Sequence, residues 1–587
     1  MQINFSNTNT IWASVLAETL KQLGLTTAVI CPGSRSTPLA IAFAQQVPHI
    51  DAIPVLDERS AAFFALGIAK KSGLPVALVC TSGTAGANFY PAIIEARESR
   101  VPLLILTADR PPELRDCHSG QTIDQVKLYG NYPNWQTELA APSLEMGMLR
   151  YLRQTIIHAW ERSLFPTPGA VHLNIPFRDP LAPIPETAAL ELRSHFKIED
   201  FFAGVRTFTP NVPPLLGEAS STLESAIEEW QQCDRGIIIA GTQSPKFPKE
   251  YCSAIAQLSQ TLKWPVLAEG LSPLRNYSQL NPYLISTYDL ILRNHKLAQQ
   301  LTPKIVIQIG ELPTSKQLRT WLEDTQPERW IIDPSHHNLD PLHGKTNHLR
   351  LSLVETRFIA SQFIAAPSSQ NEYLQLWCQV EGKVRQAIDE KMSAITHIFE
   401  SKTAWLISQT LPPETPIFIA NSMPVRDVEF FWTTNNFGIQ PFFNRGANGI
   451  DGTLSTALGI AHRYQSSVML TGDLALLHDT NGFLLRNKFV GHLTIILINN
   501  NGGGIFENLP IAKFEPPFED FFATPQDINF AQICATYNLE HELIESWEQL
   551  KQRLNPLPNK GIRILEIRTN RKADAKWRQD NLGKFAL

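Results

Sequence analysis

Several features that would narrow the class of protein are scarce or missing in this sequence of 587 residues. There are seven cysteines, an odd number, and no Cys-x-x-Cys pair, which favours free thiols in a reducing compartment over disulfides or a zinc site. No apolar run approaches membrane-spanning length, and the small net charge of −5 gives no sign of nucleic-acid binding. Because the first residues show no basic region leading into an apolar one, we expect no secretory signal and a cytoplasmic protein.

Short tandem repeats and low-complexity tracts are also absent, while the chain is too long for one hydrophobic core. Short apolar runs alternate with helix-length segments, which is the pattern of parallel sheets flanked by helices. We therefore expect an α/β fold with three domains, each built on a mainly parallel sheet, at residues 1–185, 200–366 and 372–587. A Pro-rich connection at residues 179–200 and a polar stretch at residues 365–370 are the expected linkers.

The expected strands are short and apolar. In chain order they are residues 28–30, 53–56, 76–80, 102–106, 236–240, 265–268, 305–308, 330–333, 417–420, 494–498 and 563–567. A helix is expected from residue 58 through Lys70. Polar residues and glycines follow several of these strands, and the carboxyl ends of parallel strands share the edge at which α/β folds bind ligands.

The clearest pattern of this kind lies at residues 472–504. Gly-Asp-Leu at residues 472–474 ends one strand, and Asn-Asn-Asn-Gly-Gly-Gly at residues 499–504 ends the next, with a helix-length run between them. Asp, Asn and a glycine carbonyl are hard oxygen ligands, and magnesium usually takes further oxygens from substrate phosphates. The same residue types are common in turns without any ligand, but their spacing favours a metal–diphosphate site.

This stretch resembles the thiamine diphosphate motif, in which Gly-Asp is followed one β-α-β unit later by Asn-Asn. The resemblance implies that Asp473, Asn500 and the carbonyl of Gly502 hold magnesium, or manganese, which in turn holds the diphosphate of the cofactor. Leu474 stands where the general motif has glycine, and this cofactor-binding position narrows the match to a subgroup.

Glu58 is the candidate for activating this cofactor. Thiamine diphosphate reacts through a carbanion at C2 of its thiazolium ring, and its 4′-amino group removes that proton only as the imino tautomer. A carboxyl group bonded to N1′ of the pyrimidine favours that tautomer, and Glu58 lies just past a buried strand of the first domain. The alternative is a glutamate that opens a helix and interacts with the helix dipole. With the diphosphate motif also present, we favour the catalytic role.

Further motifs point to a narrower family. Four precede the diphosphate motif in order: Cys-Pro-Gly-Ser-Arg-Ser (31–36), Thr-Ser-Gly-Thr-Ala (81–85), Thr-Ala-Asp-Arg-Pro-Pro-Glu-Leu (107–114) and Asn-Arg-Gly-Ala-Asn-Gly-Ile-Asp-Gly (444–452). Over essentially the whole chain, the sequence closely resembles the MenD family, the SEPHCHC (2-succinyl-5-enolpyruvyl-6-hydroxy-3-cyclohexene-1-carboxylate) synthases of menaquinone and phylloquinone biosynthesis. The resemblance implies a transferase that decarboxylates 2-oxoglutarate and adds the succinyl-semialdehyde carbanion to isochorismate. It also implies active sites shared between two subunits, in a homodimer at minimum or a homotetramer.

Both substrates are dianionic or close to it, which calls for arginine because its planar guanidinium binds a carboxylate through two hydrogen bonds. By the resemblance, Ser422, Arg426 and Arg445 serve the 2-oxoglutarate side near the cofactor, and Ile450 is the apolar wedge that bends the cofactor. The residues assigned to isochorismate and to the lining of the reacting carbon are Ser34, Arg35, Arg110, Gln121, Lys316, Phe506 and Leu509.

Two positions depart from the family pattern, both on the isochorismate side. His-Ser-Gly, ending at Gly120, precedes Gln121 where some relatives have Gly-Ala-Asn, and Gln317 follows Lys316 where some have a second base. Two rival functions fit less well. A carboligase acting on pyruvate would not need two arginines for a short neutral side chain, and a non-catalytic nucleotide-binding protein would have no use for Glu58.

Overall fold

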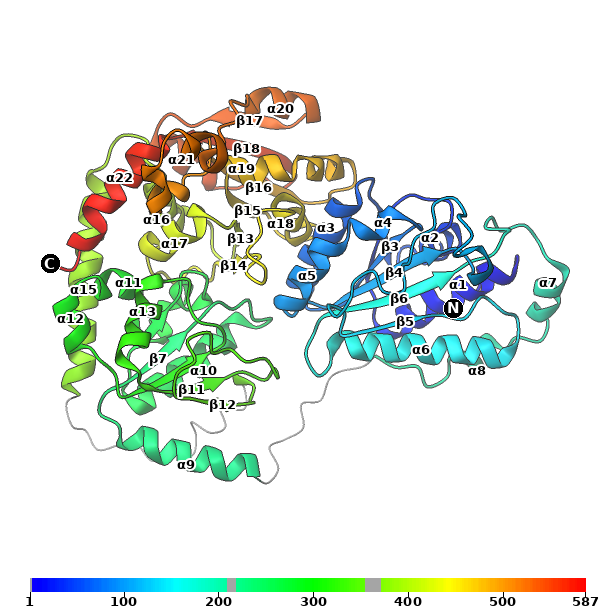
Figure 1. Cartoon of the computed structure of the whole chain (residues 1–587), viewed down its shortest axis with the longest axis horizontal. Helices are drawn as coiled ribbons and strands as arrows, with labels where there is room; N and C mark the ends of the chain where they lie inside the picture. Colours follow the sequence, from blue (N-terminus) through cyan, green and yellow to red (C-terminus); the bar gives the residue numbers. More distant parts are fainter. Residues whose placement is uncertain (1–2, 208–217, 354–370) are drawn as a thin grey trace. The chain divides into compact units, whose positions relative to one another are not determined.

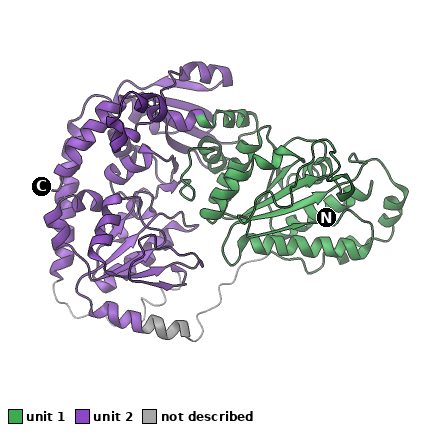
Figure 2. Cartoon of the chain, viewed as in Figure 1, with its two compact units in different colours: residues 1–212, 444–464, 478–490 green, residues 213–443, 465–477, 491–587 purple. Residues whose placement is uncertain are grey.

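The structure, a computed structural model, describes residues 3–207, 218–353 and 371–587. The chain forms two compact units (Figure 2): unit 1 comprises residues 1–212, 444–464 and 478–490, and unit 2 comprises residues 213–443, 465–477 and 491–587. Three six-stranded parallel sheets flanked by helices form the framework (Figure 1), which confirms the predicted α/β class. The predicted linker at residues 365–370 lies outside the described residues, and the three domain boundaries stay a prediction.

The first sheet lies in unit 1. Its strands, in spatial order, are β2 (Asp51–Pro54), β1 (Thr27–Ile30), β3 (Val76–Cys80), β4 (Leu103–Asp109), β6 (Ala170–Pro176) and β5 (Trp135–Glu138). One face packs against α1 (Thr8–Leu23), α2 (Thr37–Ala44) and α6 (Met146–Leu164), and the other against α3 (Glu58–Ser72) and α5 (Tyr90–Glu98). The connection predicted at residues 179–200 contains α7 (Thr187–Arg193) and begins α8 (Ile198–Phe202), whose phenylalanines join this core.

Helix α3 packs closely against α18 (Thr453–Ala461), which comes from the carboxyl-terminal third of the chain. Glycines permit this approach, because a Cβ at Gly67 would lie 2.1 Å from the carbonyl oxygen of Thr456, and one at Gly459 would lie 2.2 Å from that of Phe64. Residues 478–490 join the same unit. The pairing therefore fixes the loop before α18 within the unit that contains the start of α3.

The second and third sheets lie in unit 2. The second consists, in spatial order, of β12 (Thr346–Leu349), β11 (Glu328–Ile332), β10 (Ile305–Ile309), β7 (Gly236–Ala240), β8 (Val266–Ala268) and β9 (Leu284–Ile285). The third consists of β14 (Gln440–Phe442), β13 (Pro416–Ile419), β15 (Ser467–Gly472), β16 (His492–Asn499), β18 (Gly561–Arg568) and β17 (Glu540–Leu543). One apolar core runs through both parts, and the side chains of Trp377, Val384 and Ile388 belong to it.

The principal helices of unit 2 flank these two sheets. They are α9 (Glu218–Gln232), α10 (Pro248–Leu262), α11 (Tyr288–Leu292), α12 (His295–Gln300), α13 (Lys316–Thr325), α15 (Glu372–Ala394), α16 (Glu400–Thr410), α17 (Met423–Phe431), α19 (Asp473–His478), α20 (Phe530–Tyr537), α21 (Trp547–Leu554) and α22 (Arg571–Asn581). Among them, α15 supplies the core residues named above, so this long helix stabilises both sheets of the unit.

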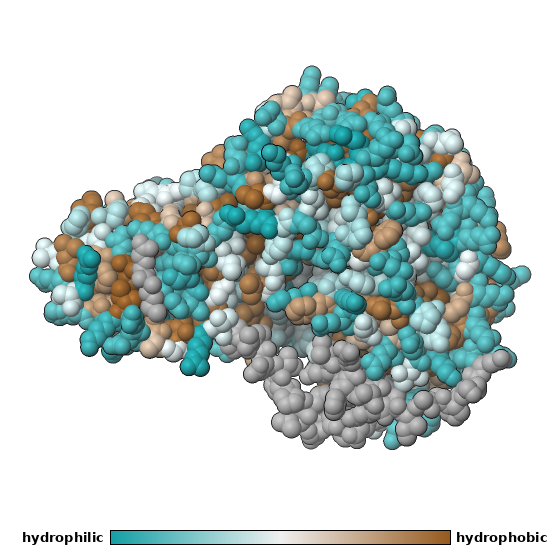
Figure 3. Space-filling model, turned by 180° about the vertical axis from the view of Figure 1, so that it is seen from behind, coloured by the Kyte–Doolittle hydropathy of each residue, from teal (hydrophilic) through white to brown (hydrophobic). Residues whose placement is uncertain are grey.

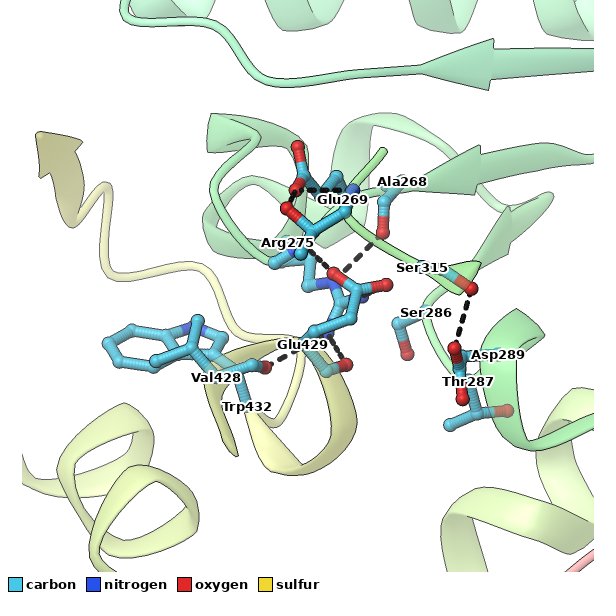
Figure 4. A network of polar contacts seen from close by, with 12 residues as sticks. Ala268, Glu269, Arg275, Ser286, Thr287, Asp289, Ser315, Val428, Glu429 and Trp432 are labelled. Carbon is cyan, nitrogen blue, oxygen red and sulfur yellow. Dashed lines mark hydrogen bonds and ion pairs between the residues drawn. The ribbon is translucent and has the colours of Figure 1, made fainter. Parts of the chain in front are cut away.

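A buried ion pair fixes α17 to the second sheet (Figure 4). The Arg275 guanidinium is fully buried, lies 3.2 Å from the Glu429 carboxylate, and donates hydrogen bonds to the carbonyls of Ala268 and Val428. Burial raises the pKa of Glu429 to about 7, and Arg275 opposes that rise. Because removing one partner would leave a buried charge uncompensated, this pair holds α17 firmly in place.

The cysteines, the surface and the lengths of the helices complete the description. All seven cysteines are free, as the sequence predicts. On the face shown in Figure 3, hydrophobic residues are scattered among hydrophilic ones. Within the ranges that the structure describes, no helix is both long enough and apolar enough to cross a membrane.

Candidate active site

The structure brings the predicted diphosphate motif together at one edge of the third sheet. Strands β15 and β16 are parallel neighbours, with Gly472 paired to Ile498, so Asp473 and Asn500 follow their strands at the same edge. Asp473 Oδ2 accepts a hydrogen bond of 2.9 Å from the backbone N–H of Gly502. Asp473, Asn500 and Gly502 therefore lie together, as the spacing in the sequence indicates.

These residues offer oxygen atoms that suit a cation. Asn500 Oδ1 is buried and has no hydrogen-bond partner among the residues that the structure describes, whereas its Nδ2 donates to Glu400 at 3.5 Å. Asp473 is buried, and burial raises the pKa of its carboxyl, so a nearby cation would stabilise the charged form. Among the described residues no group of three or more His, Cys, Asp or Glu side chains could hold a metal ion. A metal here would therefore need further oxygens, which a diphosphate can supply.

The loop after β16 admits no side chain at Gly502, the first of its three glycines. Gly502 has φ of +139°, and a Cβ there would lie 2.5 Å from the carbonyl oxygen of Ala523. The Gly502 carbonyl accepts a 2.9 Å hydrogen bond from the N–H of Gly504, which leaves its second lone pair for another partner. The loop thus presents backbone to the site rather than side chains.

Arg571, which the sequence analysis did not single out, holds the glycine loop through contacts of its guanidinium. Its Nη1 donates to the carbonyl of Asn501 at 2.9 Å, and its Nε donates to Glu507 at 3.0 Å. Nη2 contacts Glu519, in the segment whose backbone meets the glycines. Arg571 opens α22 immediately after an ordinary Asn cap, so the sequence contains no signal of this role.

Ser422 and Arg426 lie at the start of α17. Ser422 has φ of 74° and ψ of −129°, a conformation that non-glycine residues rarely adopt and that clusters at functional sites. Arg426 Nη1 donates a hydrogen bond of 2.6 Å to the Ser422 carbonyl. The two residues predicted for the 2-oxoglutarate side in unit 2 are therefore in direct contact.

A cavity of about 710 Å³ in unit 2 joins three of the predicted residues: Lys316, Arg426 and Leu509. Its other lining residues include Asp289, Arg293, His295, Gln317, Met423, Phe430, Asn508 and Arg578. Phe506 is outside this lining, although it belongs to the same short segment as Leu509. The lining thus combines several cationic side chains with the carboxylates of Asp289 and Glu429 and a few apolar side chains.

In unit 1, Glu58 is the first residue of α3 and is half-buried. Burial raises the pKa of both Cys31 and Cys80 well above the usual thiol value, and the charge of Glu58 adds to the rise. Cys31 follows β1 and Cys80 ends β3, so Glu58 lies near the carboxyl edge of the first sheet. This position is compatible with the catalytic role and equally with the helix-dipole role.

Three predicted residues of unit 1 converge on the turn after β3. The backbone N–H of Arg35 donates to Thr81 Oγ1 at 3.2 Å, the Arg110 guanidinium contacts the Ser82 hydroxyl, and Gln121 Nε2 donates to the Ser82 carbonyl at 2.9 Å. Burial lowers the pKa of Arg35, and the neighbouring Arg110 lowers it further. An anion between the two guanidinium groups would relieve that repulsion.

The remaining predicted residues of this region are more exposed. Ser34 is exposed beside Arg35. Gln121 lines a cavity of about 790 Å³ together with Gly120 and Arg115. Gly120 contributes only backbone there, and no atom lies within 4 Å of the place a Cβ would take.

The loop of residues 444–452, which carries Arg445 and Ile450, is held by a carboxylate that the sequence analysis missed. Glu95 of α5 is buried and accepts hydrogen bonds from the N–H groups of Gly446 at 3.1 Å and Ala447 at 2.7 Å. Lys70 lies 3.3 Å from the same carboxylate. A charged residue on the apolar face of a helix was the available signal, because buried carboxylates need partners.

We expect Glu95→Gln to speed amide hydrogen exchange at Gly446 and Ala447 by about tenfold or more, because hydrogen bonds to a charged acceptor contribute ~1.5–3 kcal/mol each. The amide of glutamine retains one acceptor oxygen, so one of the two loop contacts is lost. Exchange followed by mass spectrometry measures the effect. Glu98→Gln, an exposed change on the same helix, is the control, and equal protection in both variants would contradict the role of Glu95.

Fold and site together define the class. The model of the N-terminal TPP binding domain of thiamine pyrophosphate enzymes matches residues 12–128, and that of the middle domain of thiamine pyrophosphate enzymes matches residues 210–419. Proteins named 2-succinyl-5-enolpyruvyl-6-hydroxy-3-cyclohexene-1-carboxylate synthase are similar over the full length. The one from Trichormus variabilis is 69% identical over 100% of this chain and 99% of its own, and the one from Trichodesmium erythraeum is 68% identical over 100% of both. The chain belongs to the family of these synthases, which confirms the resemblance noted in the sequence.

Proposed function

We propose that the protein is a thiamine diphosphate-dependent SEPHCHC synthase. It decarboxylates 2-oxoglutarate and joins the remaining four-carbon unit to isochorismate by conjugate addition, in menaquinone or phylloquinone biosynthesis. The observation that carries the proposal is the 69% identity, over the whole chain, to an enzyme of that name. The cationic cavity with Lys316 and Arg426 supports it, because both substrates carry carboxylates.

In this proposal the residues at the sheet edge hold the cofactor. Asp473, Asn500 and the Gly502 carbonyl would bind magnesium or manganese, and Leu474, in the first turn of α19, would lie beside the diphosphate. Thiamine diphosphate, when bound, supplies the nucleophilic carbon and accepts the electrons released with carbon dioxide. Glu58 keeps a hydrogen bond to the pyrimidine ring, and Ile450 is the apolar support of the bent cofactor.

The proposed roles in substrate binding follow from the charges of the side chains and of the substrates. Arg426 and Arg445 bind the carboxylates of 2-oxoglutarate, with Ser422 beside the reacting group. The isochorismate carboxylates and the apolar lining of the reacting carbon involve Ser34, Arg35, Arg110, Gln121, Lys316, Phe506 and Leu509. The apolar side chains in this set are Phe506, which is half-buried, and Leu509, which is 47% exposed, so a bound substrate would cover apolar surface here.

We further propose a cytoplasmic homodimer or homotetramer with sites shared between subunits, built from domains at residues 1–185, 200–366 and 372–587. Light scattering coupled to size-exclusion chromatography tests the assembly. A monomer that turns over at full rate at nanomolar concentration would contradict shared sites.

A substrate panel tests the function itself. Purified protein with thiamine diphosphate and magnesium is incubated with 2-oxoglutarate or pyruvate, with and without isochorismate, and carbon dioxide release and the coupled product are followed. The proposal requires the adduct of the 2-oxoglutarate-derived unit and isochorismate to form. Preference for pyruvate would favour the rival carboligase, and no decarboxylation of either acid would favour a binding protein.

We expect Arg426→Ala and Arg445→Ala each to lower kcat/KM for 2-oxoglutarate by roughly a hundredfold or more, because an unpaired buried carboxylate costs on the order of 3–5 kcal/mol. Weak activity on a short, neutral-tailed 2-oxo acid should fall far less, because that acid lacks the distal carboxylate. Steady-state kinetics with both acids gives the comparison, and Arg150→Ala, at an exposed position of α6, is the control. Equal losses on the two acids would show that these arginines serve the cofactor or the fold.

A further inference from the structure

We propose that Arg293 is a specificity-determining residue that binds a carboxylate of isochorismate in the cavity of unit 2. The inference rests on the proposed function, and it adds a residue that neither the motifs nor the relatives point to. Arg293 follows α11 and lines the same cavity as Lys316 and Arg426.

The guanidinium of Arg293 is held at one nitrogen and open at the other two. Its Nε lies 2.9 Å from Asp289 Oδ1, and its plane lies near the Phe430 ring, 5.5 Å from the centroid. Among the described residues, neither terminal nitrogen has a hydrogen-bond partner. The side chain is 24% exposed, so the two nitrogens are accessible from the cavity. A pinned Nε with two open terminal nitrogens is the arrangement that binds a carboxylate through two parallel hydrogen bonds.

Asp289 ties Arg293 to the element that begins with Lys316. Its Oδ2 accepts a 2.5 Å hydrogen bond from the Ser315 hydroxyl, a contact drawn in Figure 4. Ser315 in turn caps α13 by accepting from the backbone N–H of Leu318 at 3.1 Å. Asp289 therefore links the Arg293 guanidinium to the start of the helix that carries Lys316, a residue assigned to isochorismate.

The other polar side chains that line the cavity leave a role for Arg293 in binding an anion. Arg578 pairs with two carboxylates through its Nη2, Asp427 at 2.7 Å and Glu400 at 3.0 Å, so its charge is already balanced. Gln317 follows Lys316 and also lines the cavity, but its side chain is neutral. Of the cations that the motifs assign to isochorismate, Lys316 lines this cavity, whereas Arg35 and Arg110 belong to unit 1. Arg293 pairs with one carboxylate, Asp289, and its two terminal nitrogens remain open, so it adds hydrogen-bond donors beside Lys316.

The test compares Arg293→Gln and Arg293→Lys with a control, Lys296→Gln, which removes an exposed charge close by on α12. We expect Arg293→Gln to raise KM for isochorismate by about tenfold or more, since hydrogen bonds to charged groups contribute this much, with KM for 2-oxoglutarate unchanged within about twofold. Arg293→Lys keeps the positive charge but lacks the planar guanidinium with its paired donors, and it should recover part of the lost affinity for isochorismate. Calorimetric titration of isochorismate into the holoenzyme without 2-oxoglutarate should show the same weakening, and Lys296→Gln should leave both quantities unchanged.

A double variant that moves the positive charge to a neighbouring position tests the inference more sharply. Adding Gln317→Arg to Arg293→Gln returns a guanidinium to the cavity and should restore most of the isochorismate affinity, which a purely structural role of Arg293 could not explain. An unchanged KM for isochorismate in Arg293→Gln, or an equal rise for both substrates, would overturn the inference. The parent protein, assayed alongside, reports on the proposed function separately: if it forms the adduct, that function stands whatever Arg293 does.

Discussion

Asp473→Ala is expected to bind thiamine diphosphate at least about a hundredfold more weakly than the parent protein in the presence of magnesium, because the only carboxylate of the predicted metal site is lost. The side chain is buried and faces the glycine loop through Gly502. Without it, the metal keeps neutral ligands only, and the diphosphate loses the charge that holds it. Isothermal titration calorimetry with the cofactor measures the change.

The same substitution also removes the acceptor of the Gly502 N–H, so a second variant separates the two effects. Asp473→Asn retains an oxygen that can accept this hydrogen bond but carries no charge. Weak binding in both variants would assign the loss to the metal, whereas recovery in Asp473→Asn would assign it to the loop. Asp324→Ala, an exposed change on α13, is the control. Parent-like affinity in Asp473→Ala would rule out the metal assignment.

The sequence predicted the central strands well and the edge strands poorly. The apolar runs at residues 76–80 and 236–240 coincide with β3 and β7. Strands β5, β9, β12, β14 and β17 were missed, and each lies at the edge of its sheet. Edge strands are half-exposed and short, so their side chains need not be apolar, and no continuous apolar run marks them.

One central strand was also missed, for a different reason. Strand β6 is buried throughout, yet His172 and Asn174 interrupt its apolar run. The structure shows why they are tolerated, because His172 Nε2 lies 2.7 Å from Thr107 Oγ1, and Asn174 Nδ2 donates to Asp109 at 2.8 Å. Buried polar side chains that satisfy one another across a sheet cannot be recognised from either strand alone.

The residues of the candidate site also fall into two groups, those that could be predicted from the sequence and those that could not. Residues that directly follow strands could be predicted, because Asp473 and Asn500 follow neighbouring parallel strands and therefore lie at the same edge of the sheet. Residues that hydrogen-bond to backbone groups could not be predicted. Glu95 and Arg571 bind loops distant from them in the sequence, and only the folded chain shows which N–H or carbonyl each of them contacts. Arg293 could not be predicted either, because its place in the cavity depends on the packing of α11 against α13.

Glu58→Gln is expected to bind thiamine diphosphate with nearly parent affinity but to slow exchange of the cofactor's C2 proton for deuterium by about two orders of magnitude or more, the range of a lost acid–base contribution. Glutamine is almost isosteric, so the packing at the start of α3 should survive, while the acidic proton is gone. Quenched-flow exchange followed by NMR of the bound cofactor measures the rate. The helix-dipole role predicts a different pattern: a loss of ~0.3–1 kcal/mol in unfolding free energy and unchanged exchange. Because thermal unfolding and C2 exchange are measured on the same variant, the two roles of Glu58 give opposite results, and parent-like exchange would mean that another group activates the cofactor.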